Sequence, residues 1–484
     1  MLGHKIVSLN NKNLSNLMSD KKLNLNGLVI LVIGSIIGGG IFSLPSELTR
    51  GAGSFAIILG FIISGIGVLS LAWVYYLLSV KKPLLTNGIY SYSKSGFGDY
   101  IGFNTAWLYW ISSTLGNVSY ATLIFGTLSY FFSIFNAHGN NLYSLIFASI
   151  LIWAINVFIS MGVRKALVLN IIINVSKLAP IILFFVIGLV FFKWHTFSFQ
   201  FFGNASLGSI YQQIKTTMIT NLWAFGGLEA AVVLSVRAKK SRDVGKATVI
   251  GLCCIIAIYI LTMVVSLGIL KRPDIAMLPD PALSYVFSAA IGPLGNIIMM
   301  AGLLISVLGS LLGWTLITAE MPYSTAKDGL MPKFLSKKNS KGATIYAIFF
   351  TTLITQLWLL FSYFNHTDYQ FLFSLASTSG LIPYVFSVLF LIQIMRQEAN
   401  RKWKDFVIPL MALLYSLWIL LAAGFKYTLF STVISLMGLI LFLFVQRKKQ
   451  VIVFKTKVEY SAALIIVIIS LITLFLIHQN YLHI

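Results

Sequence analysis

The feature that most constrains this chain is its series of long apolar segments. Hydrophobic residues make up 58% of the 484 positions and charged residues only 10%. An apolar segment of about 20 residues crosses a bilayer as a helix. We therefore predict an all-α polytopic membrane protein with about thirteen transmembrane helices. The predicted helices cover 27–48, 53–78, 99–133, 142–162, 166–192, 214–236, 247–270, 286–319, 344–364, 370–395, 406–425, 428–446 and 459–477.

The basic residues support this count and give it an orientation, because Lys and Arg collect in cytoplasmic loops. With the N-terminus inside, most of the 35 basic residues fall on inner segments. The outer segments hold only Arg50, Lys193, Lys215, Lys271, Arg272 and Lys426. The net charge of +22 then reflects orientation and attraction to anionic lipid. We expect a multi-pass protein of the cell (inner) membrane with a cytoplasmic N-terminus, and membrane lipid but no nucleic acid among its partners.

Glycines interrupt two of the apolar segments. The first contains Gly38, Gly39 and Gly40, and the second contains Gly226 and Gly227. Each such glycine costs a helix roughly 1 kcal/mol relative to Ala, and broken backbone in a membrane must be satisfied by protein or water. The first segment starts inside and the second, five segments later, starts outside. Glycine-interrupted segments at corresponding positions of two halves indicate an inverted-repeat transporter.

This topology divides the chain into five parts. A cytoplasmic N-terminal tail (1–26) precedes a first five-helix repeat (27–192), an external connection (193–213), a second five-helix repeat (214–395) and the accessory helices 11–13 (396–484). The symmetry is topological, without a residue-by-residue repeat. If the thirteenth helix lies on the membrane surface instead, the C-terminus is inside. Residues 88–99 predict a short interfacial helix. Residues 321–341 predict a basic inner loop, which can also form a surface helix on the lipid headgroups.

Ionisable groups inside a membrane are costly and usually functional. Of the 13 acids, only Glu229 lies well inside a predicted helix. Because Glu229 follows the second glycine break, we expect it to face a wet cavity as a proton site or gating group; the alternative is a structural carboxylate bonded to the freed backbone. Lys177 is the only mid-helix base. Its ammonium either replaces a bound cation beside the first break, or snorkels or pairs with a carbonyl for structure.

Uncharged groups near the breaks are candidates for substrate binding. Gly38, Gly39 and Gly40 would leave N–H groups free at the positive end of a half-helix, which suits a substrate carboxylate; the alternative is close helix packing. Trp223 precedes Glu229 by about one and two-thirds turns. If both line one cavity, Trp223 can stack on a planar cation such as guanidinium. Asn117 is a mid-helix amide that either reaches substrate or bridges helices.

Several classes of protein fit the chain poorly. The sequence has no nucleotide-binding loop of the Walker type and no metal-ligand cluster. Cys253 and Cys254 are adjacent within an apolar run, with no disulfide framework. We therefore expect no cofactor, no metal and no enzymatic activity. A channel would need a continuous polar stripe along several helices, and a sensor would need a soluble signalling domain.

Four passages resemble a known group of proteins. They are 34–45 (GSIIGGGIFSLP), 88–97 (GIYSYSKSGF), 223–231 running on to 237–240, and 319–323 with 326–329. Through them the chain, from about 22 to 449, resembles the amino acid–polyamine–organocation (APC) superfamily. Within it, the chain is most similar to the basic amino acid/polyamine antiporter family, in particular the arginine/ornithine antiporter and lysine permease group. The first passage is diagnostic of the superfamily, and the last two narrow it to the antiporters.

The resemblance implies roles for individual residues. Gly38, Gly39 and Gly40 would bind the substrate α-carboxylate. The region from Trp223 through Ala224 to Gly226 would receive the α-amino group through backbone carbonyls. Trp223 would cover the substrate, and Asn117 would contact its side chain. Trp314 would hold an inner-gate or cavity position. Glu229 would sense protons or gate transport, and Lys177 would occupy the sodium-site position. Gly39 departs from the family, which often has a small polar residue there, and this removes a possible hydroxyl contact to the carboxylate.

The expected function is secondary active transport of a small-molecule amino acid by alternating access. The resemblance implies an antiporter of cationic amino acids, with arginine and ornithine as the first pair. The alternatives are proton-coupled uptake of lysine, arginine or histidine, and exchange of histidine for histamine or agmatine for putrescine. A homodimer is the one protein assembly that we allow for.

Overall fold

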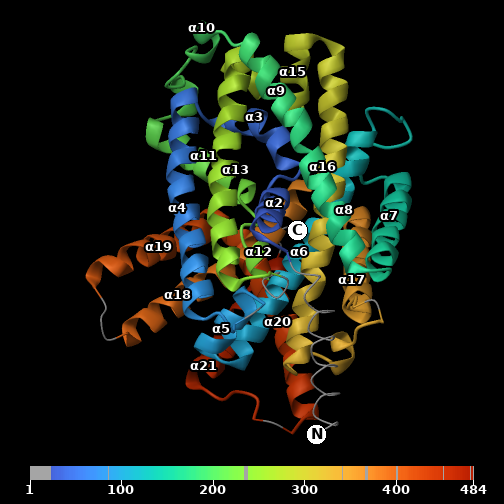
Figure 1. Cartoon of the computed structure of the whole chain (residues 1–484), viewed down its shortest axis with the longest axis vertical. Coiled ribbons are helices and arrows are strands. Elements are labelled where there is room, and N and C mark those ends of the chain that lie inside the picture. The colour runs from blue at the N-terminus through green and yellow to red at the C-terminus, as the bar shows by residue number, and fades with distance from the viewer. Residues whose placement is uncertain are drawn as a thin grey trace, which may run out of the picture.

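The computed structural model describes residues 23–85, 87–233, 238–340, 342–365, 369–398, 402–450, 452–479 and 481–482. Over these residues the chain is almost entirely helical (Figure 1). An isolated bridge pairs Leu23 with Ala238. The prediction of an all-α fold is therefore confirmed for the described part of the chain.

The helices of the first half lie close to the predicted segments. They are α2 (Leu25–Ile36), α3 (Gly40–Gly51), α4 (Ser54–Lys81), α5 (Ile89–Phe97), α6 (Asp99–Leu128), α7 (Leu142–Ser160), α8 (Val163–Ser176) and α9 (Leu178–Val190). The short helices α10 (Trp194–Phe197) and η1 (Ala205–Leu207) follow in the external connection.

The remaining helices begin with a second interrupted segment. They are α11 (Ile210–Ala224), α12 (Ala230–Val233), α13 (Ser241–Ile269), α14 (Arg272–Ala276), α15 (Ala282–Ile291), α16 (Pro293–Lys327), η3 (Lys333–Ser336), α17 (Ile345–Phe364), α18 (Tyr369–Gln397), η4 (Trp403–Phe406), α19 (Val407–Ala422), α20 (Phe425–Lys448) and α21 (Lys457–His478).

The described residues contain 10 helices that are long and apolar enough to cross a membrane, or 11 if α2 and α3 count as one bent span. The protein is therefore a multi-pass membrane protein. The 30-residue α6 is not in this set, because amides and hydroxyls such as Asn104, Thr105 and Asn117 dilute its apolar character. The α11–α12 segment is broken into short pieces. The count of thirteen and the inverted repeat stay predictions.

The structure corrects the predicted helix over 286–319 at both of its ends. The segment predicted as one helix over 286–319 is divided between α15 and α16 at Gly292, which has a φ of +77° and precedes a proline at the first position of α16. At its other end α16 continues to Lys327, so 321–327 is helix and not loop. Pro322 lies inside this last part of α16 without ending it. The short helix predicted within 88–99 is confirmed as α5.

A buried carboxylate holds the accessory helix α21 against the body of the protein. Glu459 is fully buried and accepts hydrogen bonds from the backbone N–H groups of Tyr100 (2.9 Å) and Lys455 (2.7 Å). It thereby caps the first turn of α6 and its own helix together. Gly98 leaves the space for it, since a Cβ there would lie 2.4 Å from the carboxylate. The start of α21 is thus fixed to the start of α6 beside α5, as Figure 1 shows.

The two interrupted segments lie in the middle of the molecule. α2 and α3 are bent by 48° at their break. In Figure 1 both lie in the centre of the view, with α12 beside α2 and the long helices α4, α13 and α16 around them. The breaks are therefore placed deep in the helical bundle, far from the loops at either end.

Candidate functional site

The carbonyl groups at the end of α2 are bound by side chains from other helices. Lys177 lies at the junction of α8 and α9, is fully buried, and donates to the carbonyl oxygens of Gly34 (2.6 Å) and Ile37. Trp314 Nε1 donates to Ser35 O at 3.2 Å, and Ser306 Oγ to Gly38 O at 2.9 Å. These bonds replace the helical hydrogen bonds that the break removes.

The N–H groups on the other side of this break are free. Over the described residues, the N–H groups of Gly38, Gly39 and Gly40 donate to neither a backbone nor a side-chain acceptor. They lie at the N-terminus of α3, where the helix dipole favours negative charge. All three glycines line the main cavity. The first break therefore presents hydrogen-bond donors to this cavity.

The second break has the opposite polarity. α11 ends at Ala224, α12 starts at Ala230, and Gly227 between them has a φ of +100°. The carbonyl oxygens of Phe225 and Gly226 accept no hydrogen bond from any described residue. Both residues line the cavity. Free carbonyl oxygens at this position can accept hydrogen bonds from an ammonium group.

Two hydroxyl groups tie the breaks to each other. Ser35 Oγ donates to Gly227 O at 2.9 Å. Tyr259, from α13, is buried and its hydroxyl lies 2.9 Å from Ala224 O and 3.4 Å from Ile36 O. The donors of one break and the acceptors of the other are consequently held at a fixed separation across the cavity.

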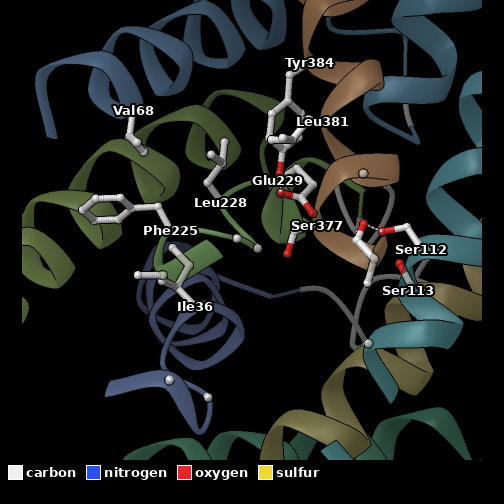
Figure 2. A pocket seen from close by; sticks show the side chains of 18 of the residues that line it. Ile36, Val68, Ser112, Ser113, Phe225, Leu228, Glu229, Ser377, Leu381 and Tyr384 are labelled. Atoms are coloured by element: carbon white, nitrogen blue, oxygen red, sulfur yellow. Dashed lines mark hydrogen bonds between the residues drawn. The ribbon is translucent and has the colours of Figure 1, made fainter. Parts of the chain in front are cut away.

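The cavity between the breaks has about 970 Å³ of empty space, part of it open to solvent. Its walls come from α3, α4, α6, the second break, α13, α16, α18 and α19. Figure 2 shows Ser112 and Ser113 of α6 on one side, with Ser377 of α18 and Glu229 nearby. Among the described lining residues, Glu229 alone is an acid and none is Lys or Arg. The cavity therefore presents several hydroxyl groups and, among the described lining residues, one carboxyl group, that of Glu229.

Glu229 lies between two tyrosines at the wall of this cavity. Its side chain is 2% exposed. Tyr109 of α6 donates to Oε1 at 3.0 Å, and Tyr384 of α18 donates to Oε2. In Figure 2 the hydroxyl group of Tyr384 points at the carboxyl group of Glu229. The sequence placed Glu229 after the glycine break of the 214–236 segment, and in the structure it lies directly before the first residue of α12. It connects the second break to α6 and α18.

Several other predicted residues also meet at the cavity. Trp314 lines it, and its ring lies 6.3 Å from that of Tyr109. Ala224 and Gly226 line it as well. Lys177 does not line it and lies behind the first break. In the part of the chain that the structure describes, no three metal-ligand side chains gather.

Asn117 and Trp223 stay as predictions. Asn117 is 1% exposed and is not among the described residues that line the cavity, although its neighbour Gly116 is. Its Oδ1 has no hydrogen-bond partner within the described residues. The backbone of Trp223 belongs to α11, and its side chain lies outside the described part of the structure.

The sequence interpretation missed the polar face of α6. Tyr109, Ser112, Ser113, Gly116 and Tyr120 all line the cavity. Their spacing of i, i+3, i+4, i+7 and i+11 is that of one helix face. The pattern is present in the sequence, but α6 carries polar residues all round, so spacing alone does not select this face over the one that bears Asn117.

Comparison with known proteins gives consistent similarities. A family profile described as amino acid permease matches residues 23–472. The arginine/ornithine antiporter of Pseudomonas aeruginosa is 39% identical over 438 residues, which cover 88% of this chain and 91% of that protein. The arginine/agmatine antiporter of Chlamydia caviae is 37% identical over 95% of this chain and 97% of that protein. A putative arginine/ornithine antiporter of Escherichia coli is 35% identical, covering 88% of this chain and 93% of that protein.

Proposed function

The chain belongs to the amino acid permease family, and we propose that it exchanges cationic amino acids across the cell membrane, with arginine and ornithine as the exchanged pair. The names of its relatives support the substrate class, since antiporters of arginine for ornithine or agmatine are 35% to 39% identical over most of the chain. The basic inner loops support a cytoplasmic N-terminus. A homodimer is part of the same proposal.

The observation that carries this proposal is the opposite polarity of the two breaks. An α-amino acid has a carboxylate and an ammonium group on one carbon atom. The N–H groups of Gly38, Gly39 and Gly40 suit the carboxylate, and the free carbonyl oxygens of Phe225 and Gly226 suit the ammonium group. Because Ser35 and Tyr259 fix one break against the other, the two breaks together form a preorganised site for the carboxylate and ammonium groups that every α-amino acid has.

The side chain of the substrate would lie against α6 and α18. Ser112 is 8% exposed and donates to Ala376 O at 2.6 Å, while the half-buried Ser377 adds a second hydroxyl nearby. Hydroxyl and carbonyl oxygens of this kind can accept hydrogen bonds from a guanidinium or ammonium group. The Trp314 ring offers an aromatic face to the same cation. Glu229 makes the cavity net negative, which favours a substrate with one net positive charge.

Glu229, Lys177 and Trp223 complete the proposal. Glu229 is the gating and proton-sensing group, because its carboxylate joins the second break to α6 and α18 through two tyrosines. Lys177 takes the place of a bound cation, since its ammonium binds the carbonyl groups at the end of α2. Trp223 covers the substrate from the end of α11, and Asn117 contacts the substrate side chain.

A second candidate is exchange of arginine for agmatine, which the names of the chlamydial relatives favour. Agmatine has no carboxylate, so it would leave the donors of Gly38, Gly39 and Gly40 unpaired. In arginine/ornithine exchange both substrates would use these glycines, whereas in arginine/agmatine exchange only arginine would use them.

Counterflow in proteoliposomes tests the proposal. Liposomes preloaded with ornithine should take up labelled arginine rapidly, and empty liposomes should take it up poorly. Equal uptake by both would refute exchange and favour proton-coupled import. Parallel liposomes preloaded with agmatine, lysine and histidine identify the preferred partner. Faster uptake against agmatine than against ornithine would replace the first candidate with the second.

A further inference from the structure

A second cavity lies behind the first helix break, on the side away from the substrate cavity. It is enclosed by α2, α8 and α16, and Gly34, Asn170, Asn174, Ser310 and Trp314 are among the residues that line it. The space at its centre is about that of one water molecule. Trp314 lines both cavities, so this tryptophan separates them.

Three buried polar side chains follow one face of the α8–α9 segment, and two of them, Asn170 and Asn174, line this cavity. Asn170, Asn174 and Lys177 follow each other at i, i+4 and i+7, and their exposed fractions are 1%, 2% and 0%. Several apolar residues of α8 face outward, such as Val168 at 51% and Ile172 at 55% exposure. Polar groups on one face of an otherwise lipid-facing helix are expensive and mark functional sites in membrane proteins.

The hydrogen bonds of the two amides are incomplete. Asn170 Nδ2 donates to Gly309 O at 2.7 Å, and Asn174 Nδ2 donates to Asn170 Oδ1 at 2.8 Å. Asn174 Oδ1 is buried and accepts no hydrogen bond from the described residues. An unpaired amide oxygen in such a place costs about 1–3 kcal/mol. A water molecule in the adjoining cavity is the natural donor for it.

Glycines on the neighbouring helices make room for these amides. A Cβ at Gly34 would lie 2.1 Å from Asn174 Nδ2, and a Cβ at Gly313 would lie 2.8 Å from Asn170 Nδ2. The close approach of α2 to Asn174 thus depends on Gly34, and that of α16 to Asn170 depends on Gly313. Gly34 also provides the carbonyl that Lys177 binds, so Asn174 and Lys177 contact the same residue of α2 from the same helix segment.

We propose that this second cavity is a water-binding site anchored on Asn174 Oδ1, and that Asn174 acts through the bound water as a positioning residue for the break between α2 and α3. The water donates a hydrogen bond to Asn174 Oδ1. Its other hydrogen bonds go to the polar groups of Ser35 and Ser310 at the cavity wall. It thereby gives the end of α2 a replaceable hydrogen-bond partner when the break changes shape during transport. The proposal concerns the motion of α2 and does not depend on which cationic amino acid is carried.

The first test is direct observation of the water. A cryo-EM map of the full chain in lipid nanodiscs, at a resolution that shows ordered water, should contain a density peak within about 3 Å of Asn174 Oδ1. The same map of Asn174→Ala should lack it. A dry cavity in the unmodified protein would overturn the proposal whatever the substrate is, so this result is independent of the counterflow test.

The second test separates the water from the contact between the two amides. Asn174→Ala removes the amide oxygen and the amide donor, whereas Asn174→Ser supplies a hydroxyl, one bond closer to the backbone, that can accept from the water. We expect arginine exchange to fall about tenfold in Asn174→Ala and to recover to within about threefold in Asn174→Ser, with the equilibrium Kd for arginine within twofold in both. Ser176→Ala is the matched control, because Ser176 is exposed on the same helix and bonds only Ile172 O.

Two outcomes would contradict the positioning role. If serine is as slow as alanine, the bond between Asn174 and Asn170 is what matters and the water is incidental. If the Kd rises as much as the exchange rate falls, Asn174 supports the substrate site and not the movement of α2. Thermal unfolding of each variant in detergent establishes that the compared proteins are folded.

Discussion

The two helix breaks face one cavity, yet they satisfy their backbone in opposite ways. At the first break the carbonyl groups are bound by side chains, among them the cationic Lys177, and the N–H groups remain free. At the second break the carbonyl groups of Phe225 and Gly226 accept nothing from the described residues, and the ionisable side chain beside them is the acid Glu229. The backbone groups that the protein does not bind itself therefore decide the polarity of a broken helix in a membrane. Free N–H groups make a donor site, and free carbonyl groups make an acceptor site.

The strongest test of this difference is Gly227→Ala at the second break. Gly227 has a φ of +100°, and an added Cβ would lie 2.8 Å from Ser35 O and 3.1 Å from Trp314. Backbone strain of this kind costs about 1–3 kcal/mol, and the contact with a backbone oxygen adds to it. We expect arginine exchange to fall at least about a hundredfold. Thermal unfolding and counterflow measure the two effects.

The matched control for this substitution is Gly292→Ala. Gly292 also has a positive φ, of +77°, but no atom lies within 4 Å of its added Cβ. It therefore carries the strain without the contact between the breaks. If both variants lose stability and exchange equally, the close approach of Gly227 to Ser35 has no special importance.

At the first break, Lys177→Met removes the ammonium and keeps an unbranched side chain of comparable length. Within the described residues, Gly34 O then loses its one side-chain donor, whereas Ile37 O keeps Ser310 at 3.4 Å and Ser306 at 3.5 Å. We expect a loss of about 2–3 kcal/mol in unfolding free energy and a large loss of exchange. Ser176→Ala on the same helix segment should leave both unchanged. Full stability in Lys177→Met would mean that the end of α2 does not need its cation.

Glu229→Gln keeps the size of the side chain and removes its charge. The cavity then loses its negative group, so the preference for arginine over neutral amino acids of similar length should fall at least about tenfold. Because an amide does not titrate, the pH dependence of exchange should flatten. Tyr384→Phe removes one hydrogen bond to Glu229 but keeps the charge, so its pH profile should persist. An unaltered profile in Glu229→Gln would return this carboxylate to a structural role.

The smallest expected effect belongs to Ser306→Ala. Ser306 Oγ donates to Gly38 O at 2.9 Å, which holds the first of the donor glycines. Loss of one such bond costs about 1 kcal/mol, so the Kd for arginine should rise about fivefold. Ser310→Ala is the internal comparison, since its bond to Ile37 O is longer at 3.4 Å and should matter less. If Ser310→Ala raises the Kd for arginine more than Ser306→Ala does, the hydrogen bond to Ile37 O matters more than the one to Gly38 O.

The sequence predicted elements better than their ends. The first helix break lies where helix propensity predicts it, because packing does not offset the helix-breaking tendency of three consecutive glycines. The predicted end of the helix at residue 319 was wrong. The basic residues of 321–341 indicated an inner segment outside this helix, yet 24 of the 35 residues of α16 are buried and tertiary packing carries it to Lys327. Local signals of this strength are routinely overridden by burial.

For the candidate site, the sequence identified ionisable residues more readily than the hydroxyls around them. Glu229 and Lys177 stand out because charge in a membrane is rare. Tyr109 and Tyr384 do not, since the chain has 21 tyrosines and most serve packing. Ser112 and Asn117 lie on different faces of one helix. Which of them is the better candidate for substrate binding depends on which face meets the cavity.

The sequence by itself determined that this chain crosses a membrane many times, that two of its helices are broken, and that a carboxylate follows the second break. These properties depend on local composition, which any stretch of sequence displays. Only the tertiary structure decided which backbone groups at the breaks are bound and which are free. Their partners are distant in the chain, 143 residues for Lys177 and Gly34, 268 for Ser306 and Gly38 and 192 for Ser35 and Gly227. Helical spacing tells which side chains share a face, but packing alone decides which faces meet.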